Sequence, residues 1–169
     1  TALTDEWMAV GVTGDGQKGA NAGAVYMYRS VAGVWTAHSK LTALYGAAGD
    51  GFGKAVTLSG TKLVVGAPSF DGFPVTTSNS GAIYLFEFDG AHWVQKVERA
   101  SPNPSADGYF GYSVALHGDV LAVGAYRENG LVGRAYAYRD LADLSAPLTL
   151  NVSGLPLHSA AGWTVAAYD

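Results

Sequence analysis

The chain has 169 residues, of which 49% are apolar and 14% are charged, and its formal net charge is −4. A typical soluble protein carries about 25% charged residues, and disordered chains are poorer in apolar ones, so this composition indicates a packed fold. The acidic balance and the lack of a Lys/Arg run argue against nucleic acid as a partner. No segment approaches the run of about 18 apolar residues that spans a membrane, so we expect no membrane insertion. Disulfides and Cys-based metal or redox chemistry are excluded because there is no Cys.

The N-terminal residues 6–11 align with residues 62–66 and therefore read as the second strand of a unit whose first strand is missing. A third run, 23–28, recurs at 81–86 and 133–138. The fourth run, 34–41, recurs at 92–97 and more weakly, without its Trp, at 147–152.

A long internal repeat organises the rest of the chain. The segment GDGFGKAVTLSGTKLVVGAPSFDG, residues 49–72, returns as DGYFGYSVALHGDVLAVGAYRENG, residues 107–130. Each copy has an aromatic-Gly pair, two short apolar runs joined by a Gly turn, and a Gly-Ala break. Such turns between alternating runs are hairpin signals, so one repeat is predicted to be a four-stranded antiparallel meander. Periods of this length are typical of solenoids, propellers or arrays.

The third run indicates how these units pack. Val25 and Met27 point to one face of the strand and Tyr26 and Tyr28 to the other, because side chains alternate, and neither face is polar. A strand that is apolar on both faces favours radially packed blades over a sandwich with one wet face. A β-helix has coils shorter than roughly fifty residues. We therefore predict an all-β fold, a β-propeller built from four-stranded antiparallel blades.

The repeat boundaries predict a single repeat domain over residues 1–169. It comprises a partial blade at 1–41, blades at 52–97 and 110–152, and a closing strand at 161–168, since 161–167 aligns with 52–58. The three blade-equivalents thus leave one terminal blade split between the N- and C-terminal strands. Closed propellers have roughly four to eight blades. Three outcomes stay open: copies that complete a ring by pairing terminal strands, an open filament, and a portion of a longer propeller.

The ordered series Phe52-Gly53, Gly66-Ala67-Pro68, Gly81-Ala82-Ile83-Tyr84 and Trp93 resembles the FG-GAP repeat of integrin α-subunit propellers. It is most similar to the form found in bacterial surface and secreted proteins. The third copy departs from the pattern, with Tyr126 in place of Pro. The resemblance implies a binding or adhesion propeller that is extracellular or at the cell surface.

The resemblance also raises the question of calcium, which the family binds through an acidic ladder in the loop joining the first two strands. Here those loops, 59–61 and 117–119, are too short to supply six or more oxygens, so we expect no cofactor. A weak Ca²⁺ site in the longer loops 13–22 and 69–80 is the alternative left open. Its oxygen-bearing side chains would be Asp15, Asn21, Asp71 and Asn79.

No catalytic pattern is visible, and we expect the protein not to be an enzyme. The four histidines are scattered over strands and loops, and no Ser lies in a Gly-x-Ser-x-Gly elbow. The loop 69–80 combines aromatic side chains with hydroxyl groups, a mixture that suits a glycan or a surface-protein partner. The candidate ligand-binding residues are Phe70, Asp71, Phe73, Thr76, Thr77 and Asn79.

The terminal strands are the candidate assembly site. Trp7 and Val10 should share one blade with Trp163 and Val165, contributed by different chains of a homo-oligomer, because open strand edges favour pairing. The sequence therefore predicts an extracellular binding propeller that self-assembles through its incomplete terminal blade. The alternatives are a structural subunit of a ring or filament, and a lectin-like, carbohydrate-binding propeller.

Overall fold

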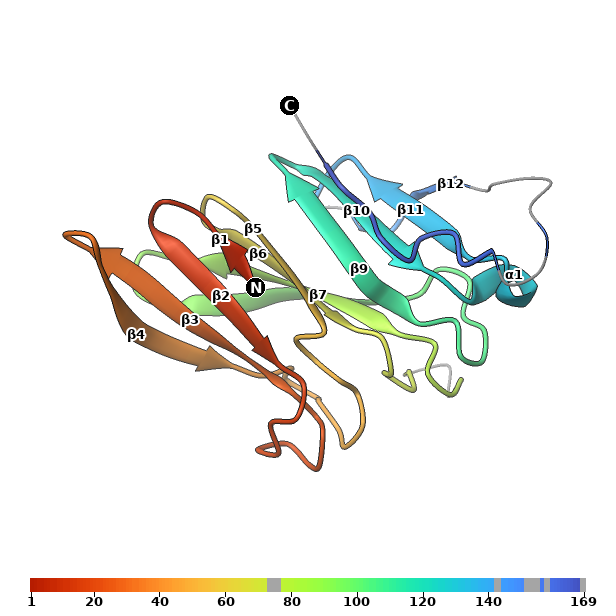
Figure 1. Ribbon diagram of the computed structural model, residues 1–169, viewed down its shortest axis with the longest axis horizontal. Coiled ribbons are helices and arrows are strands. Elements are labelled where there is room, and N and C mark those ends of the chain that lie inside the picture. The colour runs from red at the N-terminus through yellow and green to blue at the C-terminus, as the bar shows by residue number, and fades with distance from the viewer. Residues whose placement is uncertain (73–76, 142–143, 151–155, 157–158, 168–169) are drawn as a thin grey trace.

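Three four-stranded antiparallel sheets lie side by side along the molecule in the computed structural model (Figure 1). The structure describes residues 1–169 except 73–76, 142–143, 151–155, 157–158 and 168–169. Within the described residues the single helical segment is α1 (Glu128–Leu131). The predicted all-β, propeller-like fold is confirmed.

Each sheet is a meander in which consecutive strands pair, and we call the sheets blades 1, 2 and 3. Blade 1 contains β1 (Ala2–Leu3), β2 (Trp7–Val12), β3 (Ala24–Val31) and β4 (Val34–Leu41). Blade 2 contains β5 (Ala55–Ser59), β6 (Lys62–Ala67), β7 (Ala82–Phe88) and β8 (Trp93–Ala100). Blade 3 contains β9 (Phe110–His117), β10 (Val120–Ala125), β11 (Arg134–Tyr138) and β12 (Leu148–Leu150).

Blade 1 differs from our expectation that its first strand is missing. The two-residue strand β1 pairs with β2, with Ala2 opposite Ala9 and Leu3 opposite Met8. The turn between them is closed by Thr4, whose backbone N–H donates to the Trp7 carbonyl oxygen at 2.8 Å. The Thr4 hydroxyl oxygen accepts the Trp7 N–H at 2.9 Å. The two residues Ala2 and Leu3 are enough to supply a short first strand.

Both faces of the central blade are buried, as the strand pattern predicted. Tyr84 and Phe86 pack towards blade 1, in a core that also contains Val25 and Met27. Ile83 and Leu85, on the other face of β7, pack in a second core with Tyr136 and other residues of blade 3. Fully burying one such side chain stabilises the fold by about 1.5–3 kcal/mol, so these two cores supply most of the packing energy.

The blades meet where the aromatic-Gly pair of one blade crosses the glycines of the blade before it. Phe52 N–H donates to the Ala22 carbonyl oxygen at 2.9 Å, and Phe110 N–H donates to that of Ser80 at 3.0 Å. At the next crossing the Ala161 N–H donates to the Val132 oxygen at 2.8 Å. The segment at Ala161 therefore contacts blade 3 in the same way that the segment at Phe52 contacts blade 1. Residues 163–167 form no strand within this chain.

The crossings are tight enough to require glycine. A Cβ atom on Gly66 would lie 1.9 Å from the carbonyl oxygen of Gly111, and one on Gly124 would lie 1.9 Å from that of Gly162. Contacts of this kind involve backbone on both sides, so no side-chain rotation relieves them.

Gly66→Ala should therefore lower the free energy of unfolding by about 3 kcal/mol or more, because blades 2 and 3 must move apart. The matched control is Gly14→Ala, where an added Cβ meets no atom within 4 Å. That control should stay within about 0.5 kcal/mol of the wild type. Urea unfolding of the three proteins measures the difference, and equal midpoints for the two variants would contradict the role given to the crossing.

Candidate functional site

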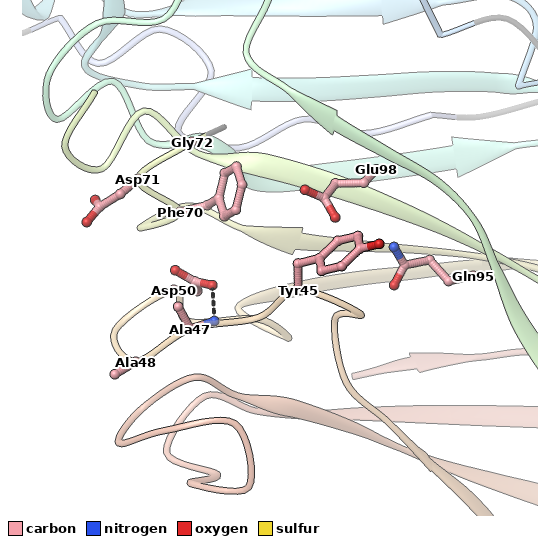
Figure 2. Close-up of a pocket in the computed structure, with 9 residues that line it drawn as sticks. All are labelled: Tyr45, Ala47, Ala48, Asp50, Phe70, Asp71, Gly72, Gln95 and Glu98. Carbon is pink, nitrogen blue, oxygen red and sulfur yellow. Dashed lines mark hydrogen bonds between the residues drawn. The ribbon is translucent and has the colours of Figure 1, made fainter. Parts of the chain in front are cut away.

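A pocket of about 730 Å³ opens at one end of blade 2, beside the segment that links blade 1 to blade 2 (Figure 2). We call it the linker pocket. It is formed by the linker itself, by the loop after β6 and by the outer strand β8. The lining residues are Tyr45, Ala47, Ala48, Asp50, Phe70, Asp71, Gly72, Gln95 and Glu98.

Asp50 fixes the linker in place. Its side chain is largely buried, with 4% exposure of the residue, and its Oδ2 atom accepts the Ala47 N–H at 2.7 Å (Figure 2). The Asp50 carbonyl oxygen accepts the Ser69 N–H at 3.2 Å, which ties the linker to the loop after β6. Burial raises the pKa of Asp50 above its ordinary value, and the neighbouring charge of Asp71 adds to the effect.

A β-bulge brings Gln95 and Glu98 to the same side of β8. Gln95 lies opposite Phe86 and Glu98 opposite Tyr84, with a register shift between these pairs. Phe86 and Tyr84 share the face of β7 that packs towards blade 1, so their partners share that face too. Without the extra residue, the side chains of Gln95 and Glu98 would point to opposite faces.

The two β8 residues then have different roles in the pocket. Gln95 Oε1 accepts the Leu44 N–H at 3.0 Å and so holds the linker against blade 2. Glu98 presents its carboxylate to the space between the rings of Phe70 and Tyr45 (Figure 2). Burial, followed by the charge of Asp50, raises the pKa of Glu98.

Two aromatic rings supply the apolar part of the lining. Phe70 is 8% exposed, and its carbonyl oxygen accepts the Gly81 N–H at 3.0 Å, which anchors the loop to the start of β7. Tyr45 is 77% exposed at the mouth of the pocket. The pocket therefore offers two ring faces, three carboxylates and one amide, with no cationic side chain in its lining. Such a surface accepts hydrogen-bond donors and repels anions.

The structure places the predicted loop residues unevenly. Phe70 and Asp71 line the linker pocket. Asn79 lies apart from it, and its amide group donates to Asp107 Oδ1 at 2.8 Å across the crossing of blades 2 and 3. Thr77 accepts the Ser80 N–H on its carbonyl oxygen and does not line the pocket. Phe73 and Thr76 lie outside the described residues.

The two carboxylates considered for Ca²⁺, Asp15 and Asp71, already have partners. Asp15 pairs with Lys40 at 2.8 Å and accepts the Gln17 N–H at 3.1 Å, while Asp71 accepts the Asn79 N–H at 2.8 Å. In the part of the chain that the structure describes, no three His, Cys, Asp or Glu side chains converge as a metal site would require.

The candidate assembly residues lie at opposite ends of the chain. Trp7 is 1% exposed, because it packs against His38, Phe88 and Trp93. Val10 lies on the outer face of β2 and is half-buried. Trp163, 51% exposed, contacts rings of blade 3, and Val165 follows it. Pairing of these segments between chains stays a prediction.

Comparison with protein families gives one match, to the FG-GAP repeat, over residues 35–86 and 93–138. The chain belongs to the FG-GAP repeat family. Each matched FG-GAP unit begins in the outer strand of one blade and ends in the third strand of the next, so it spans the crossing between blades. The first unit contains Tyr45, Asp50 and Phe70. FG-GAP repeats form integrin-like propeller domains that generally serve in binding.

The search of curated proteins found no match. Among the described residues, no helix is long and apolar enough to cross a membrane.

Glu98→Gln should reduce the pH dependence of stability above about pH 4. The raised pKa means that the folded chain holds this proton more tightly than the unfolded chain does. The stabilisation is therefore complete below the unfolded pKa of about 4.3 and is lost as the pH rises through the folded pKa. Urea midpoints across this range should fall with rising pH in the wild type and fall less in the variant.

Asp89→Asn is the control, because the pKa of Asp89 is shifted in the opposite direction to that of Glu98. The backbone N–H groups of His92 and Ala91 lower the pKa of Asp89, so its stabilisation is lost as the pH falls through the folded value. The control should lose pH dependence on the acid side only. If Glu98→Gln kept the wild-type dependence of the urea midpoint on pH, Glu98 would not be the desolvated group.

Proposed function

We propose that this chain is a non-enzymatic binding propeller, acting outside the cell or at its surface in adhesion, and that the linker pocket receives a neutral, hydroxyl-rich ligand such as a sugar. The observation that carries the proposal is the combination of two aromatic rings with Asp50 and Glu98 in one pocket. Its volume of about 730 Å³ lies within the range of roughly 300–1,000 Å³ of small-molecule sites.

The chemistry of the lining supports a sugar over an anionic ligand. The faces of Phe70 and Tyr45 match the C–H faces of a pyranose ring, and carboxylate oxygens accept its hydroxyl groups. An anion would face three carboxylates and no cation. A binding role also fits the family.

A glycan array followed by calorimetry tests the proposal. Tyr45→Ala should lower the affinity for a neutral oligosaccharide about tenfold without a change in the urea midpoint, because Tyr45 is exposed and makes little of the core. Trp35→Ala, an exposed aromatic residue of β4 outside the pocket, is the matched control and should bind as the wild type does. The absence of neutral-sugar binding, or equal loss in both variants, would contradict it.

Self-assembly is the second candidate, and the outer faces of blades 1 and 3 support it. Met8, Val10, Tyr26 and Tyr28 are half-buried on the outer face of blade 1. In the repeat they correspond to Leu63, Val65, Tyr84 and Phe86, which pack against blade 1 in the first core. The outer face of blade 3 carries Ala135 and Ala137 opposite the exposed Leu150 and Leu148. The two faces thus correspond to the two sides of an inter-blade core.

Contact between these faces in neighbouring copies would produce a ring or a filament, as the structural-subunit alternative requires. Light scattering of the wild type should give a mass above that of the monomer that rises with concentration. Ala137→Asp should return the mass to the monomer, because a buried unpaired carboxylate is costly. Val34→Asp, on the exposed edge strand β4, should not. A wild type that stays monomeric at all concentrations would exclude this candidate and leave the pocket proposal intact.

A further inference from the structure

A second surface lies beside the linker pocket. At this surface, aromatic residues occupy positions that hold other residue types elsewhere in the repeat. Tyr126 follows β10 at the place held by Pro68 in blade 2 and Thr13 in blade 1. Tyr112 and Trp163 follow a crossing glycine at the place held by Lys54. The repeat therefore accepts Thr, Pro or Lys at positions where the third blade carries aromatic rings.

These rings form one cluster, which we call the tyrosine surface, defined as Tyr109, Tyr112, Tyr126 and Trp163. Tyr126 is its centre: its ring centroid lies 5.4 Å from that of Tyr109, stacked at 12°, 4.5 Å from that of Tyr112 and 4.6 Å from that of Trp163. The three tyrosines are half-buried and Trp163 is half-exposed. Their ring faces are thus only partly used by packing within the chain.

Tyr109 is held there in an unfavourable backbone conformation. Its φ is +54°, in the left-handed region that glycine adopts freely, and the corresponding residue of blade 2 is Gly51, with φ +67°. Core packing does not explain an aromatic residue at this position, because the buried aromatic residue of the crossing is its neighbour Phe110.

Two cations border the rings. Lys54 Nζ lies 4.9 Å from the centroid of the Tyr112 ring, and Arg127 Cζ lies 5.7 Å from that of Tyr109. Neither forms an ion pair with another described residue, whereas Arg29, Lys40 and Lys62 each do. The nearby carboxylate of Asp107 is already engaged, since its Oδ1 accepts hydrogen bonds from Asn79 and from the Tyr109 hydroxyl.

Two hollows flank Tyr126. One, of about 320 Å³, is lined by Lys54, Tyr112 and Tyr126 together with the hydroxyl-bearing Thr13 and Ser69. The other, of about 210 Å³, is lined by Tyr126, Arg127 and Trp163 among others. Each hollow therefore joins ring faces to one cation, and hydroxyl groups add hydrogen-bonding capacity to the larger one.

We propose that the tyrosine surface binds an acidic sugar chain, with uronic acid rings stacked on Tyr112, Tyr126 and Trp163 and their carboxylates paired with Lys54 and Arg127. Ring faces recognise the apolar face of a pyranose, and the unpaired cations supply the charge complementarity. The charge preference is opposite to that of the linker pocket, so this site goes beyond the function proposed above. An acidic peptide would pair with the cations but would not stack repeatedly on the ring faces.

The test is a titration with an oligogalacturonate, with a neutral galactan oligosaccharide of the same length as the reference and poly-glutamate as the charge-only probe. Calorimetry should detect the uronate at low salt, weaker binding as salt rises, and at least tenfold weaker binding of both other probes. The uronate should also change tryptophan fluorescence, and Trp163→Phe should remove most of that signal.

Variants assign the site. Lys54→Gln should weaken uronate binding about tenfold, while Lys96→Gln, an exposed lysine of blade 2 away from these rings, should not. Tyr126→Pro and Tyr126→Thr restore residues that the repeat itself carries at this position, so at least one should fold, with a wild-type urea midpoint, and lose binding. Uronate binding that matches the galactan or poly-glutamate, or that survives both Lys54→Gln and the Tyr126 changes, would overturn the proposal. Tyr45→Ala should leave uronate binding unchanged, which separates this site from the linker pocket.

Discussion

The fold depends on the contact of backbone with backbone at the crossings between blades. At each crossing a glycine at the end of one blade's second strand faces the carbonyl group of another glycine, with no room for a Cβ atom between them. This contact sets the distance between blades. At that distance the side chains of β7 reach both neighbours, so Tyr84 and Phe86 fill one core while Ile83 and Leu85 fill the other. A wider crossing would leave both cores underpacked.

The linker pocket is a consequence of the same crossing. The chain must pass from the outer strand of blade 1 to the inner strand of blade 2, and it is held on the way by Asp50 and Gln95. This arrangement keeps the carboxylate of Asp50 close enough to Glu98 to disfavour ionisation of Glu98. Because desolvation of like charges is unfavourable, a ligand that donates hydrogen bonds to these carboxylates would offset part of that cost.

The two proposed binding surfaces share a wall. Asp50 and Phe70 line the linker pocket, while their neighbours Gly51 and Ser69 line the larger hollow of the tyrosine surface. The hydrogen bond from Ser69 N–H to the Asp50 carbonyl oxygen joins the two segments of this wall, the linker and the loop after β6. The carboxylates lie on one side and Lys54 on the other, so the molecule presents adjacent sites of opposite charge at one end of its blades.

The sequence by itself determined the blades, because the alternation of side chains along a strand and the glycine turns are local properties. Both recur in each repeat. It also indicated Phe70 and Asp71, since loop composition is local. The tertiary structure decided which residues join them. Gln95 and Glu98 share a face only through the bulge that the pairing of β7 with β8 imposes. Trp7 is buried because blade 2 packs over it, and β1 forms from the two residues Ala2 and Leu3. Register and inter-blade packing arise between distant segments, and for that reason no local pattern encodes them.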